Sequence, residues 1–199
     1  MNYPLKVSLA LVGLAITGAL IWNTADRSEG EQPLSTSSVW KPYDGMAQNN
    51  VNQADYFAPL FMPVLTSPIE GSMALVAEGR VAGIYYSAED AKVVQVAAEA
   101  LRDDIQWVTD QRPQVSTDAP QMSHAVLIGT IGQSPLIDGL ISAGKIDVSA
   151  IKGKWEAYAA AVVHNPLPGV DRGLIIAGSD RRGTAFGVFG LSESLGVSP

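Results

Sequence analysis

The stretch that decides the fold is GLIIAGSDRRGT, residues 173–184. Its apolar run, Leu174 to Ala177, predicts a buried strand, because an uninterrupted apolar run is typical of a strand covered on both faces. Gly178-Ser179-Asp180 then predicts a tight turn that permits close backbone approach, with Asp180 as the cap of a helix. This helix should extend from about Gly183 to Leu195. A strand, a turn and a helix in direct succession indicate a domain that mixes both element types.

The segment before this stretch also alternates short apolar runs with a helical pattern. Met73 to Ala77 and Val81 to Tyr86 flank a glycine turn and predict a β-hairpin. Ser87 should cap the next helix, with Glu89 and Asp90 at its positive end. Apolar residues recur at helical spacing from there to a stop near Gln111, before a proline.

Three further elements are expected between these two segments. Ala125 to Ile128 reads as a buried strand, and Leu136 to Ser142 as a helix with proline at its first position. The alanines of Trp155 to Val163 favour a helix, but its valine pair and the following Pro166 favour a strand, which we choose. The expected class is α/β (α+β), with a small mixed sheet covered by two or three packed helices.

The amino-terminal end has the composition of an export signal followed by a linker. Lys6 precedes sixteen uncharged, mostly apolar residues, 7–22, so residues 1–25 are expected to form a secretory signal peptide. An uncleaved signal anchor is the alternative, because Asn23 is not small, and only then is membrane attachment expected. Residues 26–54 read as a polar linker and 55–199 as the folded domain. The expected location is periplasmic or secreted.

Composition excludes several classes of function. The formal net charge of −7 and the lack of Lys/Arg clusters argue against nucleic-acid binding. The absence of cysteine excludes disulfides, thiolate catalysis and cysteine zinc sites. His124 and His164 lie forty residues apart, without metal-ligand spacing. We therefore expect neither a metal site nor a cofactor.

Candidates for sugar chemistry are present but do not combine into a catalytic site. A glycosidase needs two carboxyl groups facing each other about 5 to 10 Å apart. The acidic candidates are Asp103, Asp104, Glu156 and Glu193, and no convincing pair emerges among them. No catalytic residue is therefore assigned.

Two tryptophans and one glycine-rich turn have an alternative structural interpretation. Trp107 and Trp155 could line a sugar platform, but tryptophans in apolar runs are more often core residues, so we expect them in the core. Residues 129–134 have the context of a phosphate loop between strand and helix. They lack the Lys-Ser/Thr ending of a P-loop and the third glycine of the dinucleotide-binding fingerprint. A turn that needs glycine torsions is the expected interpretation.

Three blocks of sequence resemble one enzyme family. VLIGTIGQSPLI at 126–137, IKGKWE at 151–156 and the run 165–199 are similar to the amino-terminal domain of glycoside hydrolase family 115, the xylan α-1,2-glucuronidases. The resemblance covers about residues 70 to 199. The G-S-D-x-R-G-T block is less specific, because hexosaminidases and other α-glucuronidases carry a similar one. The implied fold is the accessory domain 2 of those enzymes.

The resemblance implies a parent enzyme that removes 4-O-methyl-glucuronic acid from glucuronoxylan. Its catalytic carboxylates would lie in a (β/α)8 barrel after Pro199, so this chain is expected to be an inactive fragment that reaches the polysaccharide only through that barrel. The resemblance also allows a homodimer of the parent. The residues that carry over are those of the domain junction, as interface or cleft-bordering residues: Gly178, Ser179, Asp180, Arg182 and Gly183.

This sequence departs from the family at two positions and leaves two other functions open. Phe186 stands where tyrosine is common, and Gly190 where an acidic residue is common. One alternative is a stand-alone secreted module that binds a glycan or a protein through exposed aromatic residues. The other is a fragment of a hexosaminidase-like glycosidase, which shares the same turn.

Overall fold

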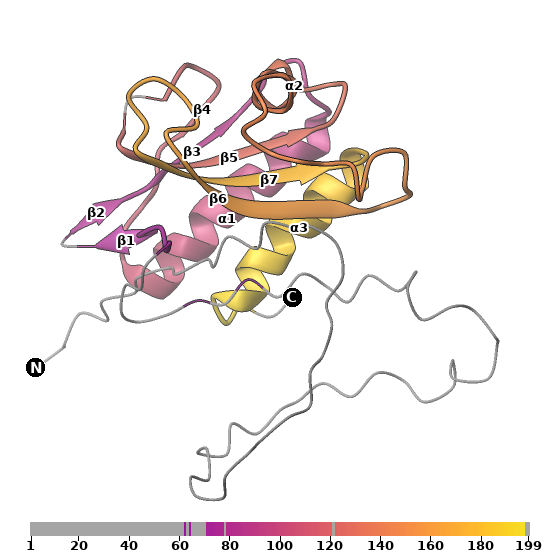
Figure 1. Ribbon diagram of the computed structural model, residues 1–199. Coiled ribbons are helices and arrows are strands. Elements are labelled where there is room, and N and C mark those ends of the chain that lie inside the picture. Colours follow the sequence, from indigo (N-terminus) through magenta and orange to yellow (C-terminus); the bar gives the residue numbers. More distant parts are fainter. Residues whose placement is uncertain (1–61, 63, 65–70, 78, 121, 198–199) are drawn as a thin grey trace, which may run out of the picture. The chain divides into compact units, whose positions relative to one another are not determined.

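The computed structural model describes residues 62, 64, 71–77, 79–120 and 122–197, which form a sheet with helices on both faces (Figure 1). The elements in chain order are β1 Val76–Ala77, β2 Arg80–Val81, β3 Gly83–Tyr86, α1 Lys92–Thr109, β4 Val115–Ser116, β5 His124–Thr130, α2 Pro135–Ser142, β6 Tyr158–His164, β7 Arg172–Gly178 and α3 Arg181–Ser194.

The main sheet has five strands in the order β4-β3-β5-β7-β6. Neighbouring strands from β4 to β7 are parallel, whereas β6 pairs antiparallel with β7 and forms one edge. A separate two-stranded sheet consists of β1 and β2. The expected mixed α/β class is therefore confirmed, with three helices in the described part of the chain.

The two faces of the sheet bury different side chains of the same strand. Figure 1 shows α1 and α3 on one face and α2 on the other. Leu174 and Ile176 of β7 belong to the core under α1 and α3, whereas Ile175 and Ala177 belong to the core under α2. Side chains alternate across a strand, so a strand covered on both faces must be apolar throughout. This is why Leu174 to Ala177 could be recognised as a strand.

The expected hairpin is shorter than its apolar runs suggested. Only β1 and β2 pair antiparallel, with Val76 opposite Val81 and Ala77 opposite Arg80. The chain then leaves the hairpin, and Gly83 pairs in parallel with Ala125 of the main sheet. The run Val81 to Tyr86 is therefore two strands in two sheets, because the parallel neighbour β5 pairs with its second half.

The expected start of the first long helix was also wrong. Helix α1 begins at Lys92, and its N-cap Ala91 provides no side-chain hydrogen bond. Ser87 instead closes a turn, in which its carbonyl accepts the Asp90 N–H at 3.1 Å. The Asp90 carboxylate accepts the N–H groups of Ala91 and Thr130, each at 2.7 Å. Asp90 thus connects the start of α1 to the end of β5.

The other predicted elements agree with the sequence expectations, whereas the two-residue strand β4 was not predicted. Helix α2 starts with Pro135, and the buried Ser134 caps it by accepting the Ile137 N–H at 3.4 Å. The segment for which helix and strand competed is strand β6. Helix α3 follows its expected cap, Asp180.

The predictions for residues 1–25, 26–54 and the domain start at 55 lie outside the described residues. Among the residues that are described, no helix combines the length and apolar character needed to cross a membrane.

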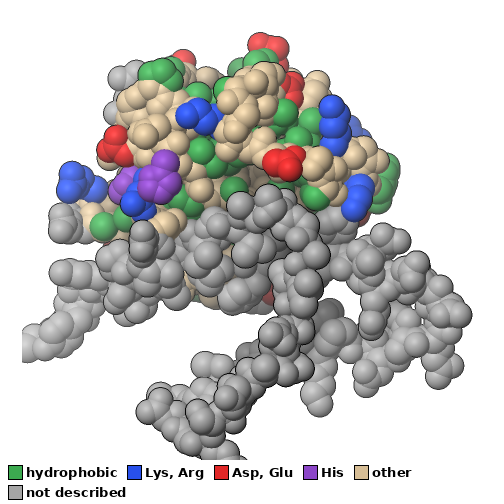
Figure 2. Space-filling view, viewed as in Figure 1, with side chains coloured by type: hydrophobic (Ala, Val, Ile, Leu, Met, Phe, Trp, Pro, Cys, Tyr) green, Lys and Arg blue, Asp and Glu red, His purple; other side chains and the backbone are tan. Residues whose placement is uncertain are grey.

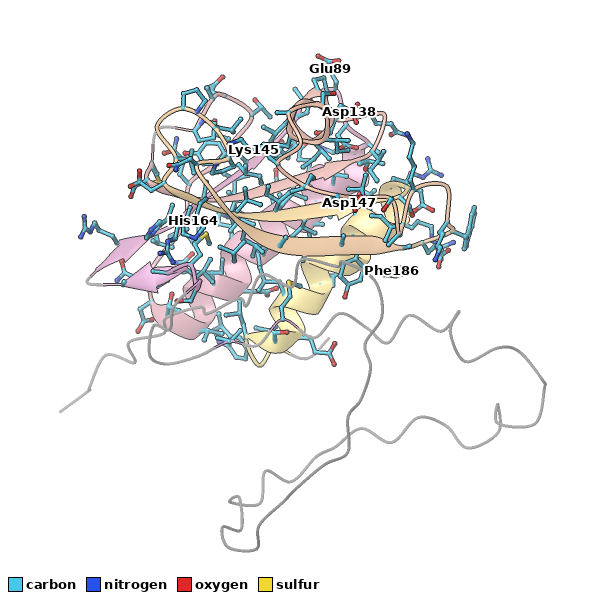
Figure 3. The ribbon with its side chains drawn as sticks, in the orientation of Figure 1. Glu89, Asp138, Lys145, Asp147, His164 and Phe186 are labelled. Carbon is cyan, nitrogen blue, oxygen red and sulfur yellow. The ribbon has the colours of Figure 1, made fainter. Side chains whose placement is uncertain are left out.

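We predict that Asp90→Ala lowers the free energy of unfolding by about 1 to 2 kcal/mol, because the buried end of β5 loses the acceptor for its Thr130 N–H. Glu89→Ala is the matched control. Figure 3 shows Glu89 at the periphery of the fold, and its removal should change stability by less than about 0.5 kcal/mol. Urea unfolding followed by circular dichroism measures both, and equal losses would contradict the role given to Asp90.

Candidate functional site

The candidate site is the turn between β7 and α3, residues 178–183. It lies at the carboxyl ends of the parallel strands β3, β5 and β7, since Tyr86 pairs with Ile128, and Thr130 with Gly178. Binding sites of open α/β sheets lie at this edge of the sheet. The location therefore agrees with a functional or interface role.

The two glycines of the turn are required by close approach of the backbone. A Cβ atom on Gly178 would lie 2.2 Å from the Thr184 nitrogen, and one on Gly183 would lie 2.2 Å from the Ala157 carbonyl oxygen. Carbon atoms cannot approach backbone atoms so closely. Only glycine lets the first turn of α3 pack against the ends of β6 and β7.

Ser179 joins the end of β7 to the residue before β6. Its backbone N–H and its hydroxyl both donate to the Ala157 carbonyl, at 2.8 and 2.9 Å. The Ala157 N–H lies 3.0 Å from the same hydroxyl oxygen. The serine side chain thus continues the pairing of β6 and β7 beyond the last strand residue.

Asp180 accepts three backbone N–H groups from two segments. Its Oδ1 accepts those of Arg182 at 2.9 Å and Gly183 at 2.8 Å, which caps α3 as expected. Its Oδ2 accepts the Glu156 N–H at 2.8 Å. Glu156 has a φ of 54°, in the left-handed region that non-glycine residues rarely adopt. The carboxylate therefore caps a helix and also fixes a strained loop.

The three N–H groups determine the charge state of Asp180. Partial burial alone would raise the pKa of this carboxyl. The N–H groups of Gly183, Glu156 and Arg182, together with the Arg182 charge, outweigh burial and hold the pKa below its ordinary value.

Arg182 has a carboxylate partner, Glu156. Its Nη1 lies 2.8 Å from Glu156 Oε1, and its guanidinium carbon lies 5.9 Å from the centre of the Phe186 ring. Both side chains of the ion pair are at least partly exposed, so the pair contributes little stability by itself. Its main effect is to hold Arg182 between the loop and the outer face of α3.

An exposed stripe extends from Arg182 along α3. Phe186 is 44% and Phe189 46% exposed, and together with Arg182 they are spaced to lie on one side of the helix. We call Arg182, Phe186 and Phe189 the α3 stripe. At the next residue, a Cβ atom on Gly190 would lie 3.0 Å from the Tyr158 hydroxyl oxygen. The missing side chain at 190 therefore leaves room for Tyr158.

The acidic candidates of the sequence are distributed over α1, α3 and the loop before β6. Asp103 is bound by Arg102 at 2.8 Å and Arg112 at 3.2 Å on the surface of α1. Glu156 pairs with Arg182, and Glu193 is exposed on α3. Asp104 lies on α1 beside Asp103. These carboxylates belong to three separate elements, and within the described part of the chain no three acidic or histidine side chains gather as metal ligands.

The sheet brings the two histidines near each other, which their sequence separation did not indicate. His124 of β5 and His164 of β6 both lie opposite Arg172 of β7. Burial, followed by the charge of Arg172, lowers the pKa of His124, although Asp171 opposes this shift. Arg172 donates to the carbonyl of Ser72.

The expectation that both tryptophans are core residues was wrong. Trp107 is 75% and Trp155 78% exposed. Trp107 follows Ile105 by two residues and so leaves the buried face of α1, which includes Leu101 and Ile105. Trp155 lies in the loop before β6, between Lys154 and Glu156. The charged neighbours of Trp155 were the sequence signal for exposure.

The glycine-rich segment 129–134 is a structural turn, as expected. A Cβ atom on Gly129 would lie 2.4 Å from the Ser134 hydroxyl oxygen, and Gly132 has a φ of 76°. The Gly132 N–H donates to the Asp138 carboxylate at 2.9 Å. A carboxylate from the same chain thus uses a donor that a phosphate would need.

Comparison with known proteins finds similarity to solved structures. No protein-family model matches the chain, and no curated protein matches it either. A solved structure, described as "a novel family GH115 4-O-Methyl-alpha-glucuronidase, BtGH115A, with specificity for decorated arabinogalactans", is 36% identical, with a TM-score of 0.49. The match covers 59% of this chain and 14% of that chain. The chain is thus similar to a small part of a glycoside hydrolase.

Gly178→Ala should lower the free energy of unfolding by about 2 kcal/mol or more, because the new methyl group meets the Thr184 backbone and α3 must shift. Gly139→Ala on α2 is the matched control. Nothing lies within 4 Å of its added carbon, so this change should stabilise the protein by up to about 1 kcal/mol. The midpoint of urea unfolding reports both changes, provided that the dependence of the free energy of unfolding on urea concentration is unchanged. A Gly178→Ala variant as stable as the wild type would contradict the packing described.

The loss of folding stability at acidic pH should depend on Asp180. Its pKa is lowered in the folded state, so its stabilisation is complete above the unfolded-state pKa of about 4 and is lost as pH falls through the folded-state value. We expect Asp180→Asn to weaken the loss of stability between about pH 5 and pH 2. Asp118→Asn, at an exposed loop position, is the control and should leave that slope unchanged.

Proposed function

We propose that this chain is the amino-terminal accessory domain of a secreted or periplasmic glycoside hydrolase related to the xylan α-1,2-glucuronidases. The proposed parent removes 4-O-methyl-glucuronic acid from glucuronoxylan through a separate catalytic barrel. The observation that carries the proposal is the α3 stripe, held at its base by the turn 178–183. The choice of family rests on the resemblance of three sequence blocks, at 126–137, 151–156 and 165–199.

The α3 stripe has the properties of a surface that another domain covers. Phe186 and Phe189 expose nearly half of their area on adjacent turns of one helix. Neighbouring exposed aromatic residues are unusual on a soluble monomer and mark interaction sites. Arg182 borders them and adds a cation that can pair with a carboxylate across an interface. A catalytic barrel is the partner that the family similarity proposes.

The turn residues act in this proposal as positioning residues. Gly178 and Gly183 allow α3 to approach the sheet, Ser179 fastens β7 to Ala157, and Asp180 caps the helix. They fix the direction in which α3 presents its stripe. We assign the catalytic acid and base to the barrel, because that is where the family resemblance places the catalytic carboxylates.

The chain by itself should release no 4-O-methyl-glucuronic acid from glucuronoxylan oligosaccharides. Product analysis by anion-exchange chromatography would detect it. Enzymatic release by the purified chain, abolished by heat denaturation, would contradict an accessory role and place a catalytic site within the chain.

The uncovered stripe should also make the isolated chain associate. We predict that Phe186→Asp with Phe189→Asp shifts the chain toward monomer in sedimentation velocity and leaves the circular dichroism spectrum unchanged, because both side chains are already exposed. Val96→Asp on α1 is the matched control, since Val96 is 50% exposed but lies outside the stripe. A monomeric wild type, or an equal effect of Val96→Asp, would contradict the proposal.

A further inference from the structure

We propose that the loop 151–156 and the hollow beside it form a binding site for a carboxylated glycan, in which Trp155 stacks on a sugar ring and lysines bind the carboxylate. This inference goes beyond the accessory role, because the binding would be a property of this chain and would need no catalytic barrel.

The loop presents its tryptophan on a fixed support. Trp155 is 78% exposed, yet Ile151 at the start of the loop is buried, as is Ala157 just after it. The N–H of Glu156 donates to Asp180, and the Glu156 carboxylate pairs with Arg182. These contacts hold the backbone that carries Trp155.

The backbone next to Trp155 is strained, which supports a functional origin of the exposure. Glu156 has a φ of 54°, and Gly153 has a φ of 76°. A non-glycine residue in this region costs of the order of 1 kcal/mol and persists only where its surroundings impose it. Here Asp180 and Arg182 impose it.

A hollow of about 410 Å³ borders the same loop. Its lining includes Lys145, Lys152 and Asp147, and Lys152 also belongs to the loop that carries Trp155. Figure 3 labels Lys145 and Asp147 in the segment that follows α2. Asp147 accepts the Ser149 N–H at 2.8 Å, so part of its hydrogen-bonding capacity is used within the chain. Two ammonium groups and one carboxylate favour an anionic ligand on a chain whose net charge is −7.

The surroundings of Trp155 favour a glycan over a protein partner. In protein interfaces the aromatic anchor lies in a well-packed patch that excludes water. Trp155 is instead flanked by Gly153, Lys154 and Glu156, and Lys152 is also exposed. A flat ring among polar side chains suits a sugar, whose C–H face stacks on the ring while its hydroxyls meet polar groups. The lysines select a carboxylate, with which they form charge-assisted hydrogen bonds.

The test is a titration of the full chain with two xylo-oligosaccharides of equal length, one bearing a glucuronic acid branch and one neutral. We expect saturable binding by calorimetry or NMR, with the acidic ligand preferred several-fold. Trp155→Ala should weaken binding about tenfold or more, as expected when an aromatic stacking platform is removed. Trp107→Ala is the matched control and should bind as the wild type, because Trp107 is equally exposed but lies on α1.

The lysines are tested separately from the tryptophan. Lys145→Ala with Lys152→Ala should abolish the preference for the acidic oligosaccharide and leave the affinity for the neutral one unchanged. The proposal is overturned if Trp155→Ala binds as tightly as the wild type, if Trp107→Ala loses as much affinity, or if neither ligand saturates the chain by about 10 mM. Equal binding of both ligands by the wild type would overturn the carboxylate assignment. Circular dichroism establishes that each variant is folded.

Discussion

The Asp180 carboxylate is the contact on which the carboxyl-end edge of the domain depends. It accepts N–H groups from the first turn of α3 and from the loop before β6, while the chain enters it directly from β7. Two segments that are distant in sequence, the loop before β6 and the β7–α3 turn, therefore meet at two oxygen atoms. The neighbouring glycines are necessary for this arrangement, because any side chain at 178 or 183 would separate the segments that the carboxylate joins. The exposed positions of Trp155 and the α3 stripe both follow from it.

Local pattern predicted the elements whose neighbours in the chain determine them. The strand at Leu174 to Ala177, the proline-started helix α2 and the cap at Asp180 all follow from a few consecutive residues. The start of α1 did not follow from consecutive residues. Ser87 and Asp90 have the composition of a helix start, but Asp90 bonds to Thr130, forty residues away, and the helix begins only at Lys92. A partner so distant in sequence leaves no local signal.

In the candidate site, too, features set by neighbouring residues were predictable and features set by distant partners were not. The cap and the glycine turn were predictable. The carboxylate partner of Arg182, Glu156, was not, because it depends on the antiparallel pairing that brings the start of β6 to the end of β7. The tryptophans were misjudged for a related reason. Their exposure depends on which residues of α1 and of the loop face the sheet, and a count of apolar neighbours does not contain that information.

The two edges of the main sheet differ in length, and this difference limits how the sheet can grow. Strand β4 contributes two residues at one edge, whereas β6 contributes seven at the other. The interior of β6, Ala159 to Val163, is free of charge and proline, the two devices with which proteins usually protect an edge. Within the described part of the chain, no strand pairs with the outer edge of β6. A further strand would find seven residues to pair with at β6, from Tyr158 to His164, and only two at β4, so extension of this sheet would favour the β6 edge.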